Sequence, residues 1–421
     1  KIVVAQLSDR SKKLPSNLPS GITRFDEVLS ANPKALTEVK IDVKKDVLIL
    51  PYSSGTTGPP KGVKISHEQF STLVTVTAFH SAKHIYGALN PNREVASENV
   101  LLSLPFSFMY GCSMLQMSLV LGQTVIVMHH FDEEVYLQSI QDYKIHFLFL
   151  LPPISIMLAN SPNVDKYDLS SVEGALSSGA PASADICYKA INRLPNLKGI
   201  YQGYGMTETS GFCAFPVIDK TNSVTAHSGV ILPNYEMKLV DSDGVVVPFG
   251  EPGELLLRAP AMMLGYLGRP EATASAFADG WYKTGNNVKV GIYKHLKVSG
   301  DLARIDDNCY VHIICRLKEV IKTQGWQVAP AELEDILLSH LEIVDAGVIG
   351  ISWDDGDEVP FAFVVRKNNN LSKDDVHEFV NGKVAEYKRL RGGIKFVDAI
   401  PKSVTGKILR KTLADMYKNL I

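Results

Sequence analysis

A run of hydroxyl, glycine, proline and lysine residues has the composition of a phosphate-binding loop. It reads Ser53-Ser-Gly-Thr-Thr-Gly-Pro-Pro-Lys-Gly62. Glycines let a backbone wrap closely around an anion, and the N–H groups and four hydroxyls can donate to phosphate oxygens. Lys61 adds a mobile positive charge. The loop differs from the P-loop of NTPases, where Gly-Lys-Ser/Thr opens a helix, because Lys61 stands between Pro60 and Gly62. The alternative is a flexible turn, which the density of functional groups disfavours.

A second segment, Tyr201-Gln-Gly-Tyr-Gly-Met-Thr-Glu-Thr209, follows a predicted strand. Ligands of α/β sheets bind where such strands end. Glu208 is a hard oxygen ligand suited to Mg²⁺ on a triphosphate. Tyr204 offers a flat face for a purine. The alternative for this segment alone is a polar surface loop with aromatic packing.

In this order and separation, the two segments resemble the ATP signatures of the acyl-adenylate-forming superfamily. Its members include acyl-CoA synthetases, 4-coumarate–CoA ligases, beetle luciferases and the adenylation domains of peptide synthetases. Further segments agree with this resemblance: Ser178-Gly-Ala-Pro181, Gly300-Asp301 with Tyr310, Arg316–Lys322, Gly325–Glu334 and Pro401–Lys407. The similarity covers roughly residues 45–418 and is closest to the branch of 4-coumarate–CoA ligases, luciferases and acyl-CoA synthetases.

The resemblance implies an enzyme, an ATP-dependent acid–thiol ligase. A carboxylate attacks the α-phosphate of ATP to give an acyl-adenylate and pyrophosphate, and the thiol of CoA then displaces AMP. We therefore expect ATP, Mg²⁺, CoA and a small carboxylic acid as ligands. An apolar, partly aromatic acyl pocket suits a fatty or aryl acid. Two alternatives stay open: a pseudoenzyme or acyl- or nucleotide-binding protein of the same fold, and a luciferase-like acyl-adenylate oxygenase.

The resemblance also assigns roles to single residues. Lys407 would bridge the carboxylate and the α-phosphate, Thr207 would bind the α-phosphate, and Glu208 would hold the Mg²⁺. The residues expected to bind ATP or CoA are Ser53, Ser54, Gly55, Thr56, Thr57, Gly58, Lys61, Gly179, Ala180, Gln202, Gly203, Tyr204, Gly205, Asp301, Arg316, Lys318, Lys322, Gly325 and Gln327. The residues expected to line the acyl pocket are Phe108, Tyr110, Ser178 and Gly211.

The elements that must position these residues are predicted from periodicity. Val47–Leu50 has the pattern of a short buried strand, and Ser66, with Gln69 three positions on, is placed to cap a helix. Residues 146–231 alternate strands and helices, which predicts a doubly wound, mainly parallel sheet in an α/β fold. Residues 235–258 predict a small antiparallel, β-barrel-like subdomain.

The carboxyl-terminal part has the pattern of a compact α+β module, with helices over 331–340 and 373–389. Pro330 fits the first turn of the former helix. We expect a large adenylation domain over 1–316 and a small mobile domain over 317–421. The resemblance implies that the small domain rotates about a hinge near Lys318 between the two half-reactions.

The composition is that of an ordinary globular protein. The 421 residues are 45% hydrophobic and 21% charged, with 43 Lys plus Arg against 45 Asp plus Glu. Because there is no basic surplus, general nucleic-acid binding is excluded.

Five cysteines without a CxxC pair argue against a disulfide scaffold or zinc module and for a reducing compartment. Residues 99–128 carry no charge, but glycine, proline and polar interruptions favour a buried helix–strand pair over a membrane span.

The extent of the matching region and the last residues of the chain lead to two further expectations. Relatives carry a long segment before the phosphate loop, so we expect an amino-terminally truncated large domain that exposes apolar surface. Lys418-Asn-Leu-Ile421 is not the Ser-Lys-Leu-type address of peroxisomal relatives, and the cytoplasm is the expected location.

Three departures from the family pattern affect the expected site. Many relatives carry a histidine where this chain has Phe108, and a phenyl ring cannot donate a hydrogen bond. The family's Thr-Gly-Asp is split by Asn286–Gly300, so that Thr284 and Asp301 are separated and the geometry of Asp301 is at risk. Cys315 and Gln324 replace an aspartate and a lysine that are common in relatives.

Overall fold

A computed structural model describes residues 2–4, 20, 22–24, 30, 39–53, 60–180, 182–218, 227–241, 243–284, 288–290, 296–298, 301–316, 319–323, 326–353, 357–403 and 406–420. The chain divides into two compact units, Lys1–Asp42 and Val43–Ile421. In the first unit, β1 (Ile2–Val4) pairs in parallel with β2 (Ile22–Arg24). All other described elements lie in the second unit. The expected boundary near residue 316 stays a prediction.

The two ends of the predicted phosphate loop lie in a small antiparallel sheet. β5 (Lys61–Ser66) pairs with β3 (Val47–Ile49), β4 (Tyr52–Ser53) and β16 (Gly265–Tyr266). β3 is the predicted strand, but its predicted burial is wrong, since Val47 and Leu48 are both more than 40% exposed. The reason is that, among the described strands, β3 pairs only with β5 and lies at the edge of this sheet.

Helix α2 (His67–Ser81) begins as its sequence predicts. The Ser66 hydroxyl accepts from the Gln69 backbone N–H, and the Gln69 side chain accepts from the Ser66 N–H at 2.8 Å. This reciprocal capping satisfies two backbone donors at the helix start. A π-helical turn, η2 (Ala82–Tyr86), and the short α3 (Gly87–Leu89) continue α2.

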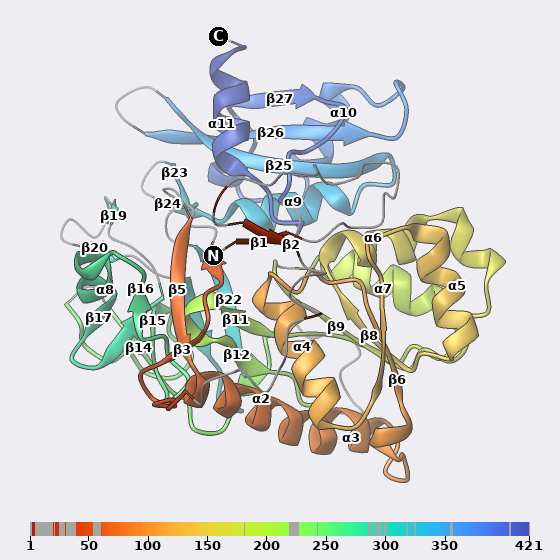
Figure 1. Ribbon diagram of the computed structural model, residues 1–421. Helices are drawn as coiled ribbons and strands as arrows, with labels where there is room; N and C mark the ends of the chain where they lie inside the picture. The colour runs from red at the N-terminus through yellow and green to blue at the C-terminus, as the bar shows by residue number, and fades with distance from the viewer. Residues whose placement is uncertain are drawn as a thin grey trace. The chain divides into compact units, whose positions relative to one another are not determined.

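The parallel strands confirm the predicted α/β architecture (Figure 1). β8 (Phe147–Leu150), β9 (Gly174–Ser177) and β10 (Ile200–Gln202) pair in the order β10-β9-β8. The connections between them contain α6 (Pro152–Asn160) and α7 (Ala184–Arg193). All residues of β8 and β9 are buried, as expected of strands covered on both faces.

The uncharged stretch over 99–128 is the predicted helix–strand pair. β6 (Asn99–Leu102) pairs in parallel with β7 (Thr124–Val127), and α4 (Met109–Val120) connects them. α5 (Glu133–Tyr143) follows, capped by the Asp132 carboxylate. In the described part of the chain, no helix is both long and apolar enough to cross a bilayer.

The antiparallel region is an open sheet rather than the expected barrel-like one. β17 (Phe277–Ala278), β18 (Trp281–Lys283), β15 (Gly253–Arg258), β21 (Asp301–Ile305) and β22 (Val311–Arg316) follow one another, and β14 (Glu236–Val240) also pairs with β15. Among the described strands, β17 and β22 do not pair with each other, so the sheet does not close. α8 (Pro270–Ala276) precedes β17.

Two further antiparallel pairings involve the segment Tyr201–Thr209 and the insertion at 286–300. β11 (Tyr204–Met206), β12 (Gly211–Phe215) and β13 (Val230–Ile231) form a three-stranded sheet, with the turn η5 (Thr207–Thr209) between the first two. Within the insertion at 286–300, β19 (Val288–Val290) and β20 (Leu296–Val298) pair as an antiparallel hairpin.

The carboxyl-terminal part is the predicted α+β module. β23 (Ile321–Thr323) and β24 (Trp326–Val328) form a hairpin, and β25 (Ile343–Ser352), β26 (Glu358–Arg366) and β27 (Gly393–Phe396) form a sheet in that order (Figure 1). Its helices are α9 (Pro330–Leu338), α10 (Lys373–Asn381) and α11 (Arg410–Lys418). The helix predicted over 373–389 is shorter, because it ends at the cap Gly382.

Candidate active site

Lys61, the lysine of the phosphate-binding motif, is the first residue of β5, which pairs with β4. Ser53 pairs with Lys61, and Tyr52 pairs with Gly62, so the β4–β5 ladder holds both ends of the loop together. Ser54, Gly55, Thr56, Thr57 and Gly58 lie outside the described residues. The Lys61 ammonium lies over the ring of Tyr266, 4.7 Å from its centroid.

The predicted magnesium ligand meets the same tyrosine. Glu208 lies in η5, directly after Thr207, and its side chain is largely buried. The Tyr266 hydroxyl donates to Glu208 Oε1 at 3.0 Å. Burial, reinforced by the nearby Glu208 charge, raises the pKa of Tyr266 well above its usual range, so the phenol keeps its proton. The structure thus brings Lys61 and Glu208 together around Tyr266, which sequence analysis missed because 58 residues separate it from Glu208.

One carboxylate fits a magnesium ion that arrives with its nucleotide. Mg²⁺ is usually held in proteins by one or two carboxylates together with substrate phosphates. Among the described residues, no group of three or more His, Cys, Asp or Glu side chains could hold a metal ion by itself. Glu208 therefore suits the expected role of a protein ligand to a magnesium ion that the nucleotide phosphates also bind.

Asp301, which the resemblance assigns to the ribose, lies next to Thr284 despite the split motif. Asp301 is buried at the start of β21, accepts a hydrogen bond from the Tyr204 hydroxyl, and donates its backbone N–H to Thr284 Oγ1 at 3.1 Å. The Thr284 hydroxyl in turn donates to the Leu255 carbonyl. Across the sheet, Asp301 pairs in register with Arg316. The two residues on either side of the insertion, Thr284 and Asp301, are thus held together by a hydrogen bond, and the role of Asp301 stays a prediction.

The expected acyl-pocket residues gather beyond the carboxyl ends of β9 and β10. Ser178 donates to the Gly203 carbonyl at 2.9 Å, and buried Tyr110 donates to the Leu176 carbonyl at 2.9 Å. The ring of Phe108 faces Gly179: a Cβ on that glycine would lie 3.7 Å from the Phe108 ring. Nearby, the Gln202 side chain accepts from the Ala182 N–H, just after Ala180.

The aromatic residues of this region form one packed cluster. Tyr110 and Phe212 meet edge to face at 5.3 Å, and Phe212 and Phe215 do so at 4.7 Å. Phe212 and Phe215 are almost fully buried, so they belong to the hydrophobic core behind the residues expected to line the acyl pocket. Gly211 packs against α2 and α4, since a Cβ there would lie 2.7 Å from Leu73 and 2.8 Å from Ser113.

The carboxyl-terminal site residues lie in a hairpin and a loop of the α+β module. Lys322 and Gln327 are cross-strand partners in the β23–β24 hairpin, and the Lys322 N–H donates to Glu358. Lys407 lies in a tight loop that is closed by a bridge between Lys402 and Ile408 and by a hydrogen bond from the Ser403 N–H to the Lys407 carbonyl. Lys318 and Gly325 lie outside the described residues. The roles assigned to all these site residues stay predictions.

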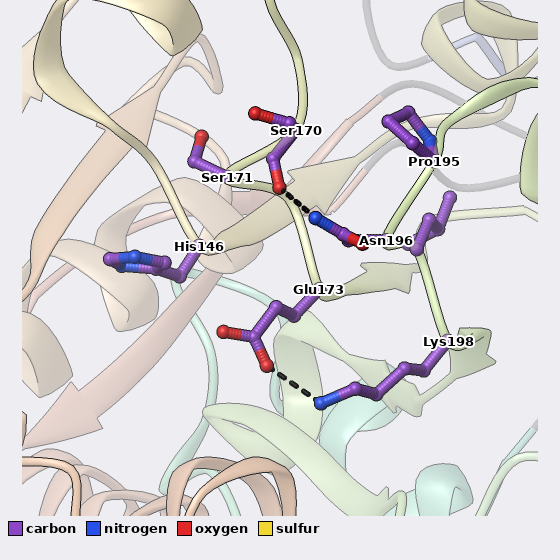
Figure 2. Close-up of a pocket in the computed structure, with 8 residues that line it drawn as sticks. His146, Ser170, Ser171, Glu173, Pro195, Asn196 and Lys198 are labelled. Carbon is purple, nitrogen blue, oxygen red and sulfur yellow. Dashed lines mark hydrogen bonds and ion pairs between the residues drawn. The ribbon is translucent and has the colours of Figure 1, made fainter.

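A cavity of about 510 Å³ lies at the other end of the parallel strands. Figure 2 shows its lining, which comes from the residues just before β8, β9 and β10, including His146, Glu173 and Lys198. Ligands of α/β sheets bind at the carboxyl ends of the strands, and this cavity lies at the amino ends. Its ionic groups are moreover paired within the protein, so we do not assign it to the nucleotide.

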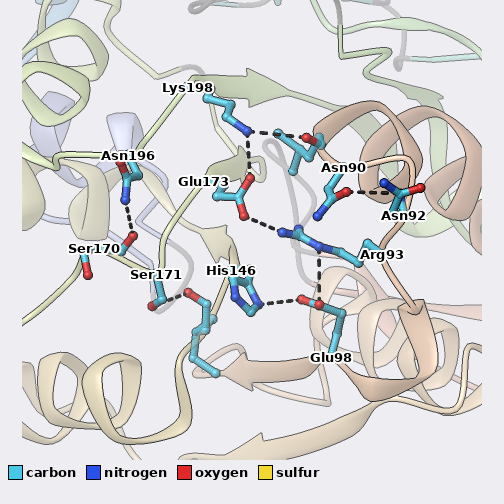
Figure 3. Close-up of polar contacts among 12 residues, drawn as sticks. Asn90, Asn92, Arg93, Glu98, His146, Ser170, Ser171, Glu173, Asn196 and Lys198 are labelled. Atoms are coloured by element: carbon cyan, nitrogen blue, oxygen red, sulfur yellow. Dashed lines mark hydrogen bonds and ion pairs between the residues drawn. The ribbon is translucent and has the colours of Figure 1, made fainter.

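These ionic groups form a network around a buried arginine (Figure 3). Arg93 contacts both Glu98 and Glu173, and its side chain is only 6% exposed. Glu173 also contacts Lys198 at 2.8 Å, and Glu98 also contacts His146 at 2.9 Å. Although burial disfavours the Glu173 carboxylate, its contacts with Lys198 and Arg93 outweigh that effect and lower its pKa. The network joins the segment after α3 to the amino ends of the sheet.

Arg93→Met is therefore expected to destabilise the fold strongly. It leaves two carboxylates without their shared cation, and removing one partner of a buried ion pair costs about 3–5 kcal/mol. Lys144→Met is the matched control, because Lys144 and Asp168 form a pair in which both side chains are at least half exposed, and such pairs contribute about 1 kcal/mol or less. Urea unfolding measures both variants. Equal losses of stability would show that the network is not a structural anchor.

Comparison with known proteins identifies the family. The sequence matches the family model of the AMP-binding enzyme over residues 4–267 and that of the AMP-binding enzyme C-terminal domain over residues 332–407. It is 40% identical to 4-coumarate–CoA ligase 2 of Nicotiana tabacum, over 94% of this chain and 70% of that enzyme.

Solved structures agree with this assignment. ATP-bound MatB from Rhodopseudomonas palustris superposes with a TM-score of 0.79 at 25% identity, over 94% of this chain and 73% of that one. The o-succinylbenzoate–CoA synthetase MenE from Bacillus subtilis, in complex with ATP and magnesium, gives 0.74 at 25% identity, over 94% and 75%. Enzymes of this kind use ATP with Mg²⁺ and CoA. The chain belongs to the AMP-binding enzymes, within the acyl-adenylate-forming CoA ligase family.

Proposed function

We propose that this protein activates an aryl or fatty carboxylic acid with ATP and transfers the acyl group to CoA. The observation that carries the proposal is the convergence of Lys61 and Glu208 on Tyr266, which gathers one cation and one magnesium ligand beside the ends of the phosphate loop. The aromatic cluster behind the pocket and the 4-coumarate–CoA ligase relatives favour an aryl acid as the first candidate.

The chemistry needs alignment and charge neutralisation rather than a general base. A carboxylate oxygen forms a bond to the α-phosphorus while the bond to the β-phosphate oxygen breaks, and pyrophosphate leaves. Lys61 neutralises the phosphates, and Lys407 and Thr207 align the carboxylate with the α-phosphate. Asp301 accepts from the ribose hydroxyls. The CoA thiolate then attacks the acyl carbon, and AMP leaves.

The movement implied by this scheme is also a proposal. Lys407 lies in the small module that we expect to begin near residue 317, and thioester formation would use Lys322, Gln327 and the segment around Gly325. One site would then serve both half-reactions through rotation about the hinge near Lys318.

The test is carboxylate-dependent ATP–pyrophosphate exchange with a panel of hydroxycinnamic, benzoic and fatty acids, with amino acids as negative controls. We expect exchange with at least one aryl acid, followed by CoA thioester formation. If no acid supports exchange while ATP still binds, the ligase proposal is wrong and the protein is a nucleotide-binding relative.

Phe108→His is expected to raise the rate of adenylation by about tenfold or more. The Phe108 ring faces Gly179 in the predicted acyl and adenine region, and it cannot donate a hydrogen bond. An imidazole N–H at this place can donate to the carboxylate or the phosphate, and a hydrogen bond to a charged group is worth about 1.5–3 kcal/mol. Single-turnover adenylation measures the effect. Phe108→Leu is the control and should give no gain; an equal gain would point to relief of crowding instead.

A further inference from the structure

Tyr266 lies between the two parts of the predicted ATP site and contacts both. Its hydroxyl donates to the Glu208 carboxylate, and its ring carries the Lys61 ammonium on one face. The side chain is 4% exposed, so neither contact is a chance encounter on the surface. We propose that Tyr266 is a positioning residue that orients Glu208 for magnesium and Lys61 for the phosphates of ATP; this proposal deepens the proposed function and rests on it.

The backbone around Tyr266 ties the same two parts together. On one side, the Met263 N–H donates to the Glu208 carbonyl at 2.9 Å. On the other side, the N–H groups of Leu264 and Leu267 donate to the carbonyls of Lys64 and Gly62 at 2.9 and 2.8 Å, in the strand that bears Lys61. The segment 263–267 therefore sets the distance between η5 and β5, and Tyr266 adds the side-chain contacts within that frame.

The tyrosine is itself held in one orientation. Its backbone N–H donates to the Thr273 hydroxyl at 2.9 Å, and that hydroxyl donates to the Arg269 carbonyl at 3.0 Å. The Tyr266 hydroxyl donates to one oxygen of Glu208, Oε1, and leaves Oε2 for a metal ion. Groups that orient a metal ligand in this way typically change metal affinity by about 10- to 100-fold when they are removed.

Two substitutions separate the two contacts of Tyr266. Tyr266→Phe removes the hydroxyl and keeps the ring, so the contact with Lys61 remains. Tyr266→Leu removes both. Tyr136→Phe is the control, because Tyr136 is a fully buried phenol of α5 whose hydroxyl has no partner among the described residues.

The first measurement is equilibrium binding of ATP, with and without Mg²⁺, and it needs no turnover. For Tyr266→Phe we expect the Mg²⁺ concentration that half-saturates the enhancement of ATP binding to rise about tenfold or more, with ATP binding in EDTA unchanged. For Tyr266→Leu, both quantities should weaken. Tyr136→Phe should change neither quantity. Unfolding curves of all variants separate this loss from a loss of structure.

The second measurement is pyrophosphate exchange as a function of Mg²⁺, where high Mg²⁺ should restore the Tyr266→Phe rate towards the unmodified one. An unchanged Mg²⁺ dependence in Tyr266→Phe, or equal losses with and without Mg²⁺, would overturn the positioning role, as would a protein that binds no ATP. If the binding shift appears but no acid supports exchange, the proposed ligase function fails and the positioning role stands.

Discussion

Lys407→Ala is expected to lower the rate of acyl-adenylate formation by about 100- to 1,000-fold. A single donor aimed at the charge that develops in a transition state has an effect of this size. The loop that presents Lys407 is closed by backbone contacts of Lys402, Ser403 and Ile408, so truncation of the side chain should leave the loop intact. The measurement is single-turnover adenylation with the acid found in the exchange panel.

The second half-reaction provides the internal control for this variant. Thioester formation from supplied acyl-adenylate and CoA should stay within a few-fold of the unmodified rate, because the proposed scheme does not use Lys407 in that step. Lys418→Ala, which removes a 73% exposed lysine of α11, should change neither half-reaction. Equal losses in both half-reactions would contradict the role and indicate general damage to the module.

Gly205→Ala is expected to destabilise the protein by about 3 kcal/mol or more, or to prevent folding. A Cβ on Gly205 would lie 2.1 Å from the Gly211 carbonyl oxygen and 2.6 Å from Phe212 Cα. Both are backbone atoms, so relief requires β11 and β12 to separate. Tyr204 is the first residue of β11, and Glu208 lies in the turn between β11 and β12. ATP binding should therefore be lost when the two strands separate. Thermal unfolding and ATP binding measure the two effects.

Gly382→Ala is the matched control for this substitution. Gly382 caps α10 with a φ of −73°, and a Cβ there would meet the Glu378 carbonyl oxygen at an ordinary 3.5 Å. We expect a change within about 0.5 kcal/mol, since the site has room and no backbone strain. A Gly205→Ala protein as stable as Gly382→Ala would show that the β11–β12 contact can relax.

Local sequence predicts correctly those elements for which residue type and position in the chain indicate the same structure. Ser66 with Gln69, Pro330, and the strand–helix alternation over 146–231 each predict the structure that is found. The errors have local causes too. The predicted helix over 373–389 runs past Gly382, which ends it. The burial predicted for β3 came from its apolar run, whereas among the described strands β3 pairs with one neighbour and lies at the sheet edge.

The site was only partly predictable for a different reason. Lys61, Glu208 and Asp301 stand in motifs whose resemblance to the family suggests their roles. Tyr266 carries no such signal, since its contacts are with Lys61 and Glu208, which are far away in sequence. Thr284 belongs to the split motif, but its hydrogen bond to Asp301 across the insertion could not be read from the sequence. Gly205 was expected among the residues that bind ATP or CoA, and the structure gives it a packing reason, the close passage of β12.

The hydrogen bond between the Asp301 N–H and Thr284 holds these two residues together whatever the length of the chain between them. Once two points of a chain are held together, doubling the loop between them costs only about 0.6 kcal/mol in closure entropy. Insertions and deletions at this point are thereby nearly neutral for the site, and selection has little to act on. The fold thus offers a place where the chain can lengthen or shorten without moving Asp301.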